Sequence, residues 1–468
     1  NMTDYSYLPK SSTKEDVALA YEISIDKGKT HTYTIEIKYV NDAVVDQSID
    51  MGQSLSGTIY IREFTKPTMK LTDKLMADNP TIGTRTTFTA FTETNKGTLY
   101  KATEQIGTNP VKDVYYFAGD AKNNWVKFGK ENFRSCTYKG KGVVYADMTN
   151  QTTKTPENET ECTSTNICDA GEKGYAVGLT ESECSGITGT KWITEKATWN
   201  VIATTDIYWR IIRTNHDGSI RLLYSGTSPD TTSGYIGASA FDSNFIGPMY
   251  VGYMYGTSGS LDSNRTNTND STIKTYVDNW YKNNLTAYTK YLSNDAVYCN
   301  DRELASGSTY NTGNTTFYYA PYGRLDSNKT PTYNCTNNKD AFSGSNSEAK
   351  LTYPIGLMSI DEIAYAGGKA HTKLPSSYTW YYLNSAGGSI TEKFWWWSLS
   401  PSYCNNYSYP YVWLVYGSGI SGRLGFNVVD GSNAVRPAIS LKTCTLWTSG
   451  NGAPETPYEI RLDSDISC

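Results

Sequence analysis

The most informative part of this chain is residues 394–441, with the sequence FWWWSLSPSYCNNYSYPYVWLVYGSGISGRLGFNVVDGSNAVRPAISL. From Phe394 to Tyr416, ten of 23 residues are aromatic, against 13% in the whole chain. No charged side chain occurs between Lys393 and Arg423. Burying one Trp hides about 200 Å² of surface, which contributes roughly 5 kcal/mol. Such a concentration of aromatic residues predicts a rigid frame.

Three consecutive Trp residues begin this frame. Neighbouring side chains on a strand point to opposite faces, so the three cannot share one side. We expect Trp395 and Trp397 to support the structure from the core. Trp396 would then face another layer, a partner or solvent.

The residues after the Trp triplet predict a binding surface. Ser402–Tyr411 consists of Ser, Tyr and Asn at eight of ten positions. Burying these hydroxyls and amides would require a hydrogen-bond partner for each, whereas short polar and aromatic side chains on a rigid frame are typical of binding loops. The predicted ligand contacts are Tyr403, Asn405, Asn406, Tyr407, Tyr409, Tyr411, Trp413 and Trp396.

The composition indicates an extracellular, β-rich protein. A chain of 468 residues is too long for one hydrophobic core, so we expect two or three domains. The 42 basic residues nearly balance the 47 acidic ones, which argues against nucleic acid and anionic lipid as partners. No apolar run approaches the roughly 18 residues that span a bilayer. We find no signal peptide and interpret the chain as a processed form.

The nine cysteines indicate disulfide bonds in an oxidising compartment, because no C-x-x-C pair suggests zinc or thioredoxin chemistry. Cys299 and Cys335 bracket one segment, and Cys444 and Cys468 bracket the C-terminal tail. Four more lie in one insert and allow three pairings, and Cys404 is then the odd one. The four are Cys136, Cys162, Cys168 and Cys184.

Residues 1–108 predict a small N-terminal β-sandwich. Segments 32–40 and 56–62 alternate polar and apolar residues, as half-buried strands do. The sequence is loosely similar to the immunoglobulin-like or fibre-forming modules of bacterial surface proteins. Asn1–Lys10 is interpreted as an extended arm, or as a first strand or frayed end.

Residues 109–198 predict a strand pair, at 114–117 and 125–128, followed by the disulfide-stapled insert. The insert is interpreted as a stabilised surface loop in preference to a spacer or contact face.

Residues 199–468 predict a larger α+β domain. A turn at 215–218 joins two strands into a hairpin, 207–213 and 220–224. Ser271 can cap a helix through about Leu292, and Ser359 can cap a second one through Ala366. A hairpin around 417–419 and a last strand at 435–441 complete the domain.

Three segments of this domain resemble a known family. Leu357–Gly368 is similar to a helix segment of the formylglycine-generating-enzyme branch of C-type lectin folds. Trp397–Pro401 and Ala434–Leu441 resemble the ends of a C-terminal domain found in many bacterial surface proteins. Relatives in that fold include the variable proteins of diversity-generating retroelements, and the resemblance covers about residues 205–445.

The resemblance implies a C-type-lectin-like scaffold that presents a hypervariable ligand-binding surface. In the retroelement proteins, adenines of the coding sequence are mutated, so positions with asparagine codons come to encode Asn, Tyr, Ser, Cys and similar residues. The composition of Ser402–Tyr411, with an unpaired Cys404, fits such diversification.

The sequence argues against an enzyme. His31, His216 and His371 are scattered, and no zinc-protease, hydrolase, P-loop or Rossmann motif occurs. The oxygenase relatives use an active-site cysteine pair, which has no convincing equivalent here. Asp361 and Glu362 could form an acid–base pair, but adjacent carboxylates at a helix start usually complement the helix dipole. We expect no catalysis and no cofactor.

Metal binding is not supported either, because the lectin calcium motifs Glu-Pro-Asn and Trp-Asn-Asp are missing. Asp262, Asn264, Asn269 and Asp270 could form a calcium loop, but a solvated Asn-rich loop is the favoured interpretation. Arg436 is expected to hold a carboxylate or backbone carbonyls beneath the binding loop.

The sequence therefore predicts a recognition protein or adhesin on a cell surface or secreted, with an unidentified protein or glycan as its ligand. The alternative is a structural subunit of an extracellular filament. In that case the N-terminal arm completes a neighbour's sheet and the chain forms a homopolymer.

Overall fold

The computed structural model describes residues 69–88, 97–229, 231, 233–313, 315–372, 380–385, 388–389, 394–417 and 422–462. The chain divides into two compact units, Asn1–Pro67 and Thr68–Cys468, and the described residues belong to the second. The expected N-terminal sandwich core and the arm Asn1–Lys10 therefore lie outside the described residues. None of the helices described is long and apolar enough to cross a membrane.

The boundary between the units lies at Pro67 instead of at the expected residue 108. Helix α1 (Leu71–Asp78), strand β1 (Thr81–Thr84) and strand β2 (Thr98–Glu104) belong to the second unit. They do so because Leu71 and Leu75 are buried in its core, and β2 pairs antiparallel with β3 (Lys112–Tyr116).

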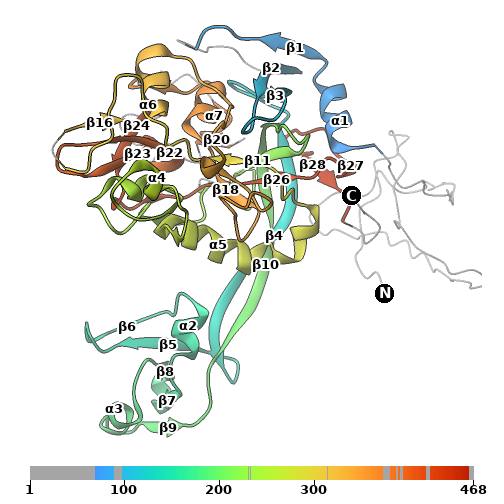
Figure 1. Ribbon diagram of the computed structural model, residues 1–468. Helices are drawn as coiled ribbons and strands as arrows, with labels where there is room; N and C mark the ends of the chain where they lie inside the picture. The colour runs from blue at the N-terminus through green and yellow to red at the C-terminus, as the bar shows by residue number, and fades with distance from the viewer. Residues whose placement is uncertain are drawn as a thin grey trace, which may run out of the picture. The chain divides into compact units, whose positions relative to one another are not determined.

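Two long antiparallel strands, β4 (Trp125–Tyr138) and β10 (Thr198–Thr214), connect the main body to the cysteine-rich insert. Figure 1 shows both strands continuing from the main sheet to the segment that lies between them in sequence. The insert contains β5 (Lys141–Asp147), β6 (Thr152–Lys154), α2 (Glu159–Thr163), β7 (Ile167–Asp169), η2 (Gly171–Lys173), β8 (Tyr175–Val177), α3 (Glu181–Ser185) and β9 (Lys191–Ile193).

The insert has two small cores of its own: Tyr138, Val143, Ile167 and Val177 pack around one disulfide, and Ala146 and Leu179 pack around the other. Of the three pairings that the sequence allows, the structure contains Cys136–Cys162 and Cys168–Cys184. The expected pair Cys299–Cys335 is confirmed in the main body. Cys444 is disulfide-bonded as well, and its expected partner Cys468 lies outside the described residues.

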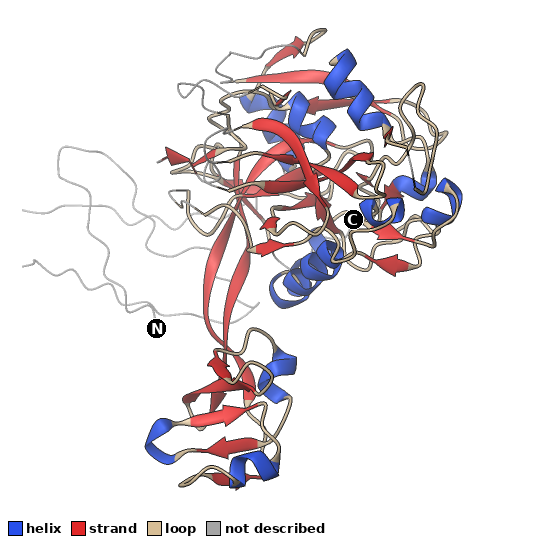
Figure 2. Ribbon diagram, turned by 90° about the vertical axis from the view of Figure 1, so that its left-hand side faces the viewer, coloured by secondary structure: helices blue, strands red, loops and turns tan. Residues whose placement is uncertain are grey.

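The main body is mostly β-sheet, with few helices (Figure 2). The expected hairpin is confirmed, because β10 pairs antiparallel with β11 (Ile220–Tyr224). Strand β11 also pairs with β26 (Pro437–Leu441), and β18 (Ile355–Leu357) pairs with the other edge of β26. Strand β28 (Tyr458–Ile460) pairs with β27 (Trp447–Ser449) and β4.

The two expected helices are confirmed, and their caps explain their boundaries. Helix α5 (Thr272–Asn284) begins after Ser271, whose side chain accepts from the Lys274 N–H, and the 3-10 helix η4 (Thr286–Tyr291) continues it. Helix α7 (Ile360–Tyr365) begins at a reciprocal capping box between Ser359 and Glu362.

A second sheet carries the aromatic stretch of the sequence. Its strand order is β12-β25-β22-β23-β24-β19, and β16 pairs with β22. These strands are β12 (Ala238–Ser239), β16 (Phe317–Tyr318), β19 (Lys369–Ala370), β22 (Trp396–Cys404), β23 (Pro410–Val415), β24 (Arg423–Val428) and β25 (Asn433–Ala434). The short remaining elements are η3 (Pro248–Val251), β13 (Met254–Tyr255), α4 (Leu261–Asn264), β14 (Asn269–Asp270), β15 (Tyr298–Cys299), α6 (Ala320–Tyr322), η5 (Gly323–Asn328), η6 (Asn338–Asp340), β17 (Ala341–Phe342), β20 (Asn384–Ser385) and β21 (Gly388–Ser389).

A buried ion network joins α7 to the main sheet. Besides its capping role, Glu362 binds Arg213 on β10 at 2.8 Å and Arg221 on β11 at 3.4 Å. Arg213 also binds Glu104 on β2 at 2.9 Å. All four side chains have exposures of 3% or less. Opposite charges are therefore neutralised inside the core.

The buried network predicts a strong effect of the substitution Glu362→Gln. We expect the unfolding free energy to fall by about 3 kcal/mol, because two buried guanidinium groups lose a compensating charge. Urea unfolding followed by Trp fluorescence measures this, since all 11 Trp residues lie after residue 67. The exposed Glu455→Gln is the control. Equal stability of the two variants would contradict this role for Glu362.

Acid should weaken the same network through Glu104. Burial opposes ionisation of Glu104, but Arg213 and His216 outweigh it and hold the pKa of the carboxyl at about 2, against 4.5 when unfolded. Because the folded pKa is the lower one, this stability is present above pH 4.5 and is lost as the pH falls toward 2. Urea titrations across this window should show wild type losing about 3 kcal/mol more than Glu104→Gln. Parallel pH profiles would contradict it.

Candidate ligand-binding surface

The Trp triplet lies where the second sheet begins, but its members face differently from the expectation. Trp396 and Trp397 both have 0% exposure, whereas Trp395 is 37% exposed. The sheet is covered on both faces at this point: Trp397 donates to the Ser239 carbonyl at 2.9 Å, and Trp396 lies 5.0 Å from the Arg436 guanidinium. Trp396 therefore offers no surface to a ligand, which corrects its assignment as a contact residue.

Trp395 precedes the strand, and its ring packs edge-on against Tyr416 at 4.4 Å. It is therefore a partly exposed rim residue, and not the core support that we expected.

Arg436 lies beneath the second sheet with 0% exposure. Its Nη2 donates to the Tyr224 carbonyl at 2.9 Å, and its Nη1 donates to the Tyr382 carbonyl. Burial lowers the pKa of the guanidinium to about 9. Arg436 thus connects the end of β11 to the segment under Trp396 by holding backbone carbonyls.

The turn from β22 to β23 is built by two of its polar residues. Asn405 Oδ1 accepts hydrogen bonds from the backbone N–H groups of Tyr407 at 3.0 Å and Tyr409 at 2.9 Å. Ser408 is buried at a φ of 60°, and its hydroxyl donates to the Thr312 carbonyl at 2.6 Å. Asn406 and Tyr407 are left exposed, Tyr407 by 69%. Asn405 therefore shapes the turn, while Asn406 and Tyr407 are accessible to a partner.

A cluster of half-buried aromatic rings, which we call the aromatic face, covers one side of β22, β23 and β24. Tyr403 and Tyr411 are paired across β22 and β23, and their rings stack at 4.3 Å with 6° between the planes. Phe426 on β24 packs edge-on against both, at 4.9 and 6.0 Å. Tyr318 and Tyr322 contact Tyr403 at 5.8 and 6.3 Å. The face thus combines rings from five elements.

Trp413 is the foundation of the aromatic face and not part of its surface. It has 0% exposure and packs edge-on against Phe426 at 5.7 Å. Trp413 and Tyr411 lie on the same side of β23, where both contact Phe426. Trp413 is nevertheless covered by the surrounding rings, so it offers no surface to a ligand.

One edge of the aromatic face is charged. His371 packs against Phe426 at 5.7 Å, its Nε2 lies 2.9 Å from Asp326, and its Nδ1 lies 3.3 Å from an Arg423 nitrogen. Burial lowers the pKa of His371, and Arg423 acts in the same direction against Asp326, which favours the neutral ring. A ligand on the face would therefore meet an acid, an imidazole and a guanidinium beside the rings.

Four residues of this site were missed by sequence reasoning: Tyr318, Tyr322, Phe426 and His371. The signal for the first two was the aromatic run Phe317–Tyr322 (FYYAPY). Phe426 stands two residues after Leu424 on a strand, and this alternation could have placed it on one face. His371 has no sequence signal that relates it to β24.

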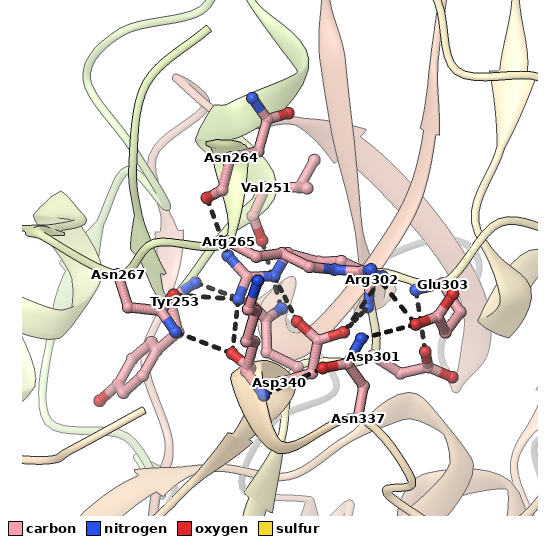
Figure 3. A network of polar contacts seen from close by, with 12 residues as sticks. Val251, Tyr253, Asn264, Arg265, Asn267, Asp301, Arg302, Glu303, Asn337 and Asp340 are labelled. Carbon is pink, nitrogen blue, oxygen red and sulfur yellow. Dashed lines mark hydrogen bonds and ion pairs between the residues drawn. The ribbon is translucent and has the colours of Figure 1, made fainter. Parts of the chain in front are cut away.

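Figure 3 shows a second network of polar contacts, centred on the buried Arg265, Arg302 and Asp340. Arg302 binds Asp340 at 2.6 Å, and it donates to the Met254 carbonyl at 2.8 Å. Arg265 lies 3.3 Å from Asp340 and 3.2 Å from Glu303. The backbone of Glu303 in turn accepts from the N–H of Ala320, which begins α6. The segment that carries Met254 and Arg265, the segment that carries Arg302 and Glu303, and the segment that carries Asp340 are therefore held together by buried charges.

The calcium loop considered from the sequence has another organisation. Asn264 uses its amide within the protein, donating to the Thr257 carbonyl at 2.8 Å and accepting from the Tyr310 hydroxyl at 2.9 Å. Asp270 is paired with Lys274 at 3.1 Å. Within the described part of the chain, no three His, Cys, Asp or Glu side chains gather in a way that could hold a metal ion.

Comparison with protein-family models, curated proteins and solved structures gives no match to this chain.

The structure predicts that Cys404 is chemically inert in the folded protein. It is free, has 0% exposure, and its thiol pKa is raised to about 12 by burial. Thiols react as thiolates, so iodoacetamide at pH 8 should leave Cys404 unmodified until urea unfolds the chain. Mass spectrometry of the Cys404 peptide measures this. Equal labelling with and without urea would contradict the buried position.

Proposed function

We propose that this protein is an extracellular recognition protein or adhesin that binds its ligand through the aromatic face and the neighbouring turn. The observation that carries the proposal is the gathering of five half-buried aromatic rings, Tyr318, Tyr322, Tyr403, Tyr411 and Phe426, on one side of a sheet. Exposed Tyr407 extends this surface at the turn.

Half-buried tyrosines suit recognition for physical reasons. They offer a large contact area with few rotatable bonds, and the hydroxyl can bond to a partner. Here the rings pack on one another, so little side-chain entropy remains to be lost on binding. Trp413, fully buried beneath them, keeps the surface in place. Preorganised aromatic residues are typical centres of binding energy.

We also propose that the scaffold is C-type-lectin-like. In support, the three segments that carry the resemblance meet in one core. The Leu399 N–H donates to the Met358 carbonyl at 2.8 Å, and the Ile360 N–H donates to the Ser400 hydroxyl at 3.0 Å. Strand β26, which contains most of the third segment, pairs with β18 directly before α7.

Diversification of the kind found in retroelement variable proteins would then act at the accessible positions. Tyr403, Asn406, Tyr407, Tyr409 and Tyr411 are at least partly exposed. Cys404 and Ser408 are buried, and Asn405 holds the turn. These three we assign to the frame. The three disulfides among the described residues favour an extracellular setting.

The proposal is tested with the double variant Tyr318→Ala, Tyr411→Ala in the full chain. Fluorescent protein is applied to a glycan array and to intact bacterial and epithelial cells. We expect wild type to be retained on at least one of these surfaces, and the variant to bind at least about tenfold more weakly, since each aromatic contact contributes of order 1 kcal/mol or more.

The matched control is Tyr145→Ala, Tyr175→Ala, which removes two half-buried tyrosines of the insert. It should bind like wild type. If both variants bind equally, or if wild type is retained nowhere, the aromatic face is not a recognition surface. Circular dichroism melting checks that the variants remain folded.

A further inference from the structure

An open cleft with a volume of about 410 Å³ lies beside the first half of α5. Strands β12, β13 and β14 and the loop after β12 form its other walls. The volume lies within the range of small-molecule sites, roughly 300–1,000 Å³. None of the residues lining this cleft belongs to the aromatic face. It is therefore a separate candidate site.

The lining of the cleft is polar and almost uncharged. Of its ten residues, eight carry a hydroxyl or an amide, and the other two are Asp242 and Asp270. Lys274 neutralises Asp270 at 3.1 Å and also binds Asp278 at 2.7 Å. The cleft thus presents one uncompensated carboxylate among many groups that both donate and accept hydrogen bonds.

Asp242 is the group that points to a ligand. Its residue is 1% exposed, and its Oδ1 accepts from the backbone N–H of Asn244 at 2.9 Å and from the side-chain amide at 3.1 Å. Its Oδ2 is buried and accepts no hydrogen bond of normal geometry within the described residues, although the backbone N–H of Thr272 lies close enough to lower the pKa of the carboxyl. Leaving a buried acceptor unsatisfied costs free energy. A hydrogen-bond donor from a ligand would remove that cost.

The position of α5 keeps this carboxylate suited to accept. The Ser243 N–H donates to the Thr272 hydroxyl at 2.9 Å, so the Asp242 loop is attached to the first residue of the helix. The N-terminal end of a helix carries a partial positive charge, which favours the ionised form. Burial acts against it and raises the pKa of Asp242.

The chemistry of the walls restricts the class of ligand. Among the described residues, no Lys, Arg or His lines the cleft, so nothing there favours an anion. Two aspartates, one of them already paired, are too few for the metal sites considered above. Tyr255 and Tyr276 supply the rings in the described part of the lining. Hydroxyl and amide groups with two aromatic rings match a molecule that has many hydroxyls and some apolar C–H surface.

The wall formed by β13 is preorganised. Met254 and Tyr255 pair with Asp270 and Asn269. The Met254 carbonyl accepts from Arg302 of the buried network in Figure 3 at 2.8 Å. A wall fixed in this way loses little entropy when a ligand binds.

We propose that this cleft binds a neutral saccharide without a metal ion, and that Asp242 Oδ2 accepts a hydrogen bond from a sugar hydroxyl. The proposal does not rest on the function of the aromatic face. It assigns a second site, so a protein that recognises a surface ligand would also hold a sugar at a distinct place.

The test uses saturation-transfer NMR on the full chain with cellobiose, maltose, lactose and chitobiose, each at about 5 mM, which detects millimolar affinity. EDTA is present throughout. We expect at least one disaccharide to receive saturation. Calorimetry should then show about a tenfold weaker Kd for Asp242→Asn, because a hydrogen bond to a charged acceptor is lost.

A second variant guards against misfolding. Thr275 and Asn279 are exposed on α5, so Thr275→Ala, Asn279→Ala removes two cleft groups while favouring the helix. We expect an unchanged or higher melting temperature and weaker saccharide binding. The aromatic-face variant Tyr318→Ala, Tyr411→Ala should bind saccharide normally, which separates this proposal from the proposed function.

Three results would overturn the proposal. No saturation of any of the four disaccharides would do so, and so would saturation that survives both cleft variants. The third is binding of ethylammonium, tested in the same way, with none of the sugars bound. In that case the cleft is a cation site that uses the Asp242 charge.

Discussion

A single buried carboxylate constrains how this protein is assembled. Glu362 closes the capping box of α7, accepts a hydrogen bond from Arg213 on β10 and forms an ion pair with Arg221 on β11. Charges are costly to remove from water unless paired, so the helix and both strands must meet in one arrangement. The neighbouring Asp361 binds Arg324 at 2.8 Å in the same way. The position of α7, and through it the start of β22, is therefore fixed by electrostatics as well as by packing.

Elements with a local signal could be predicted from the sequence. Ser271 and Ser359 cap helices where they were expected to, and the turn at 215–218 joins two strands. The disulfide between Cys299 and Cys335 was expected for the same reason, because its cysteines bracket one segment. What could not be predicted was decided by distant parts of the chain. Leu71, Leu75 and Leu99 pack in the core of the second unit, so the segments that carry them belong to that unit.

In the candidate site too, local relations could be predicted from the sequence, whereas contacts between distant segments could not. Strand alternation indicates opposite faces for Trp396 and Trp397, but it cannot tell that both faces of the sheet are covered. Trp413 shares a side with Tyr411, yet Tyr322 and Phe426, from other elements, pack against it. The tyrosines around it keep part of their surface in water. Which side chains share a face of a strand can be predicted from the sequence. Whether they are exposed depends on how distant segments pack against them.

The insert is carried by β4 and β10, two covalent backbones that run antiparallel from the main sheet. A pull on the insert would therefore be borne by two main chains in parallel, with the hydrogen bonds between them loaded little. The disulfides Cys136–Cys162 and Cys168–Cys184 close loops within the insert and limit how far it could unravel under tension. This connection has the mechanics of a double-stranded tether that resists stretching.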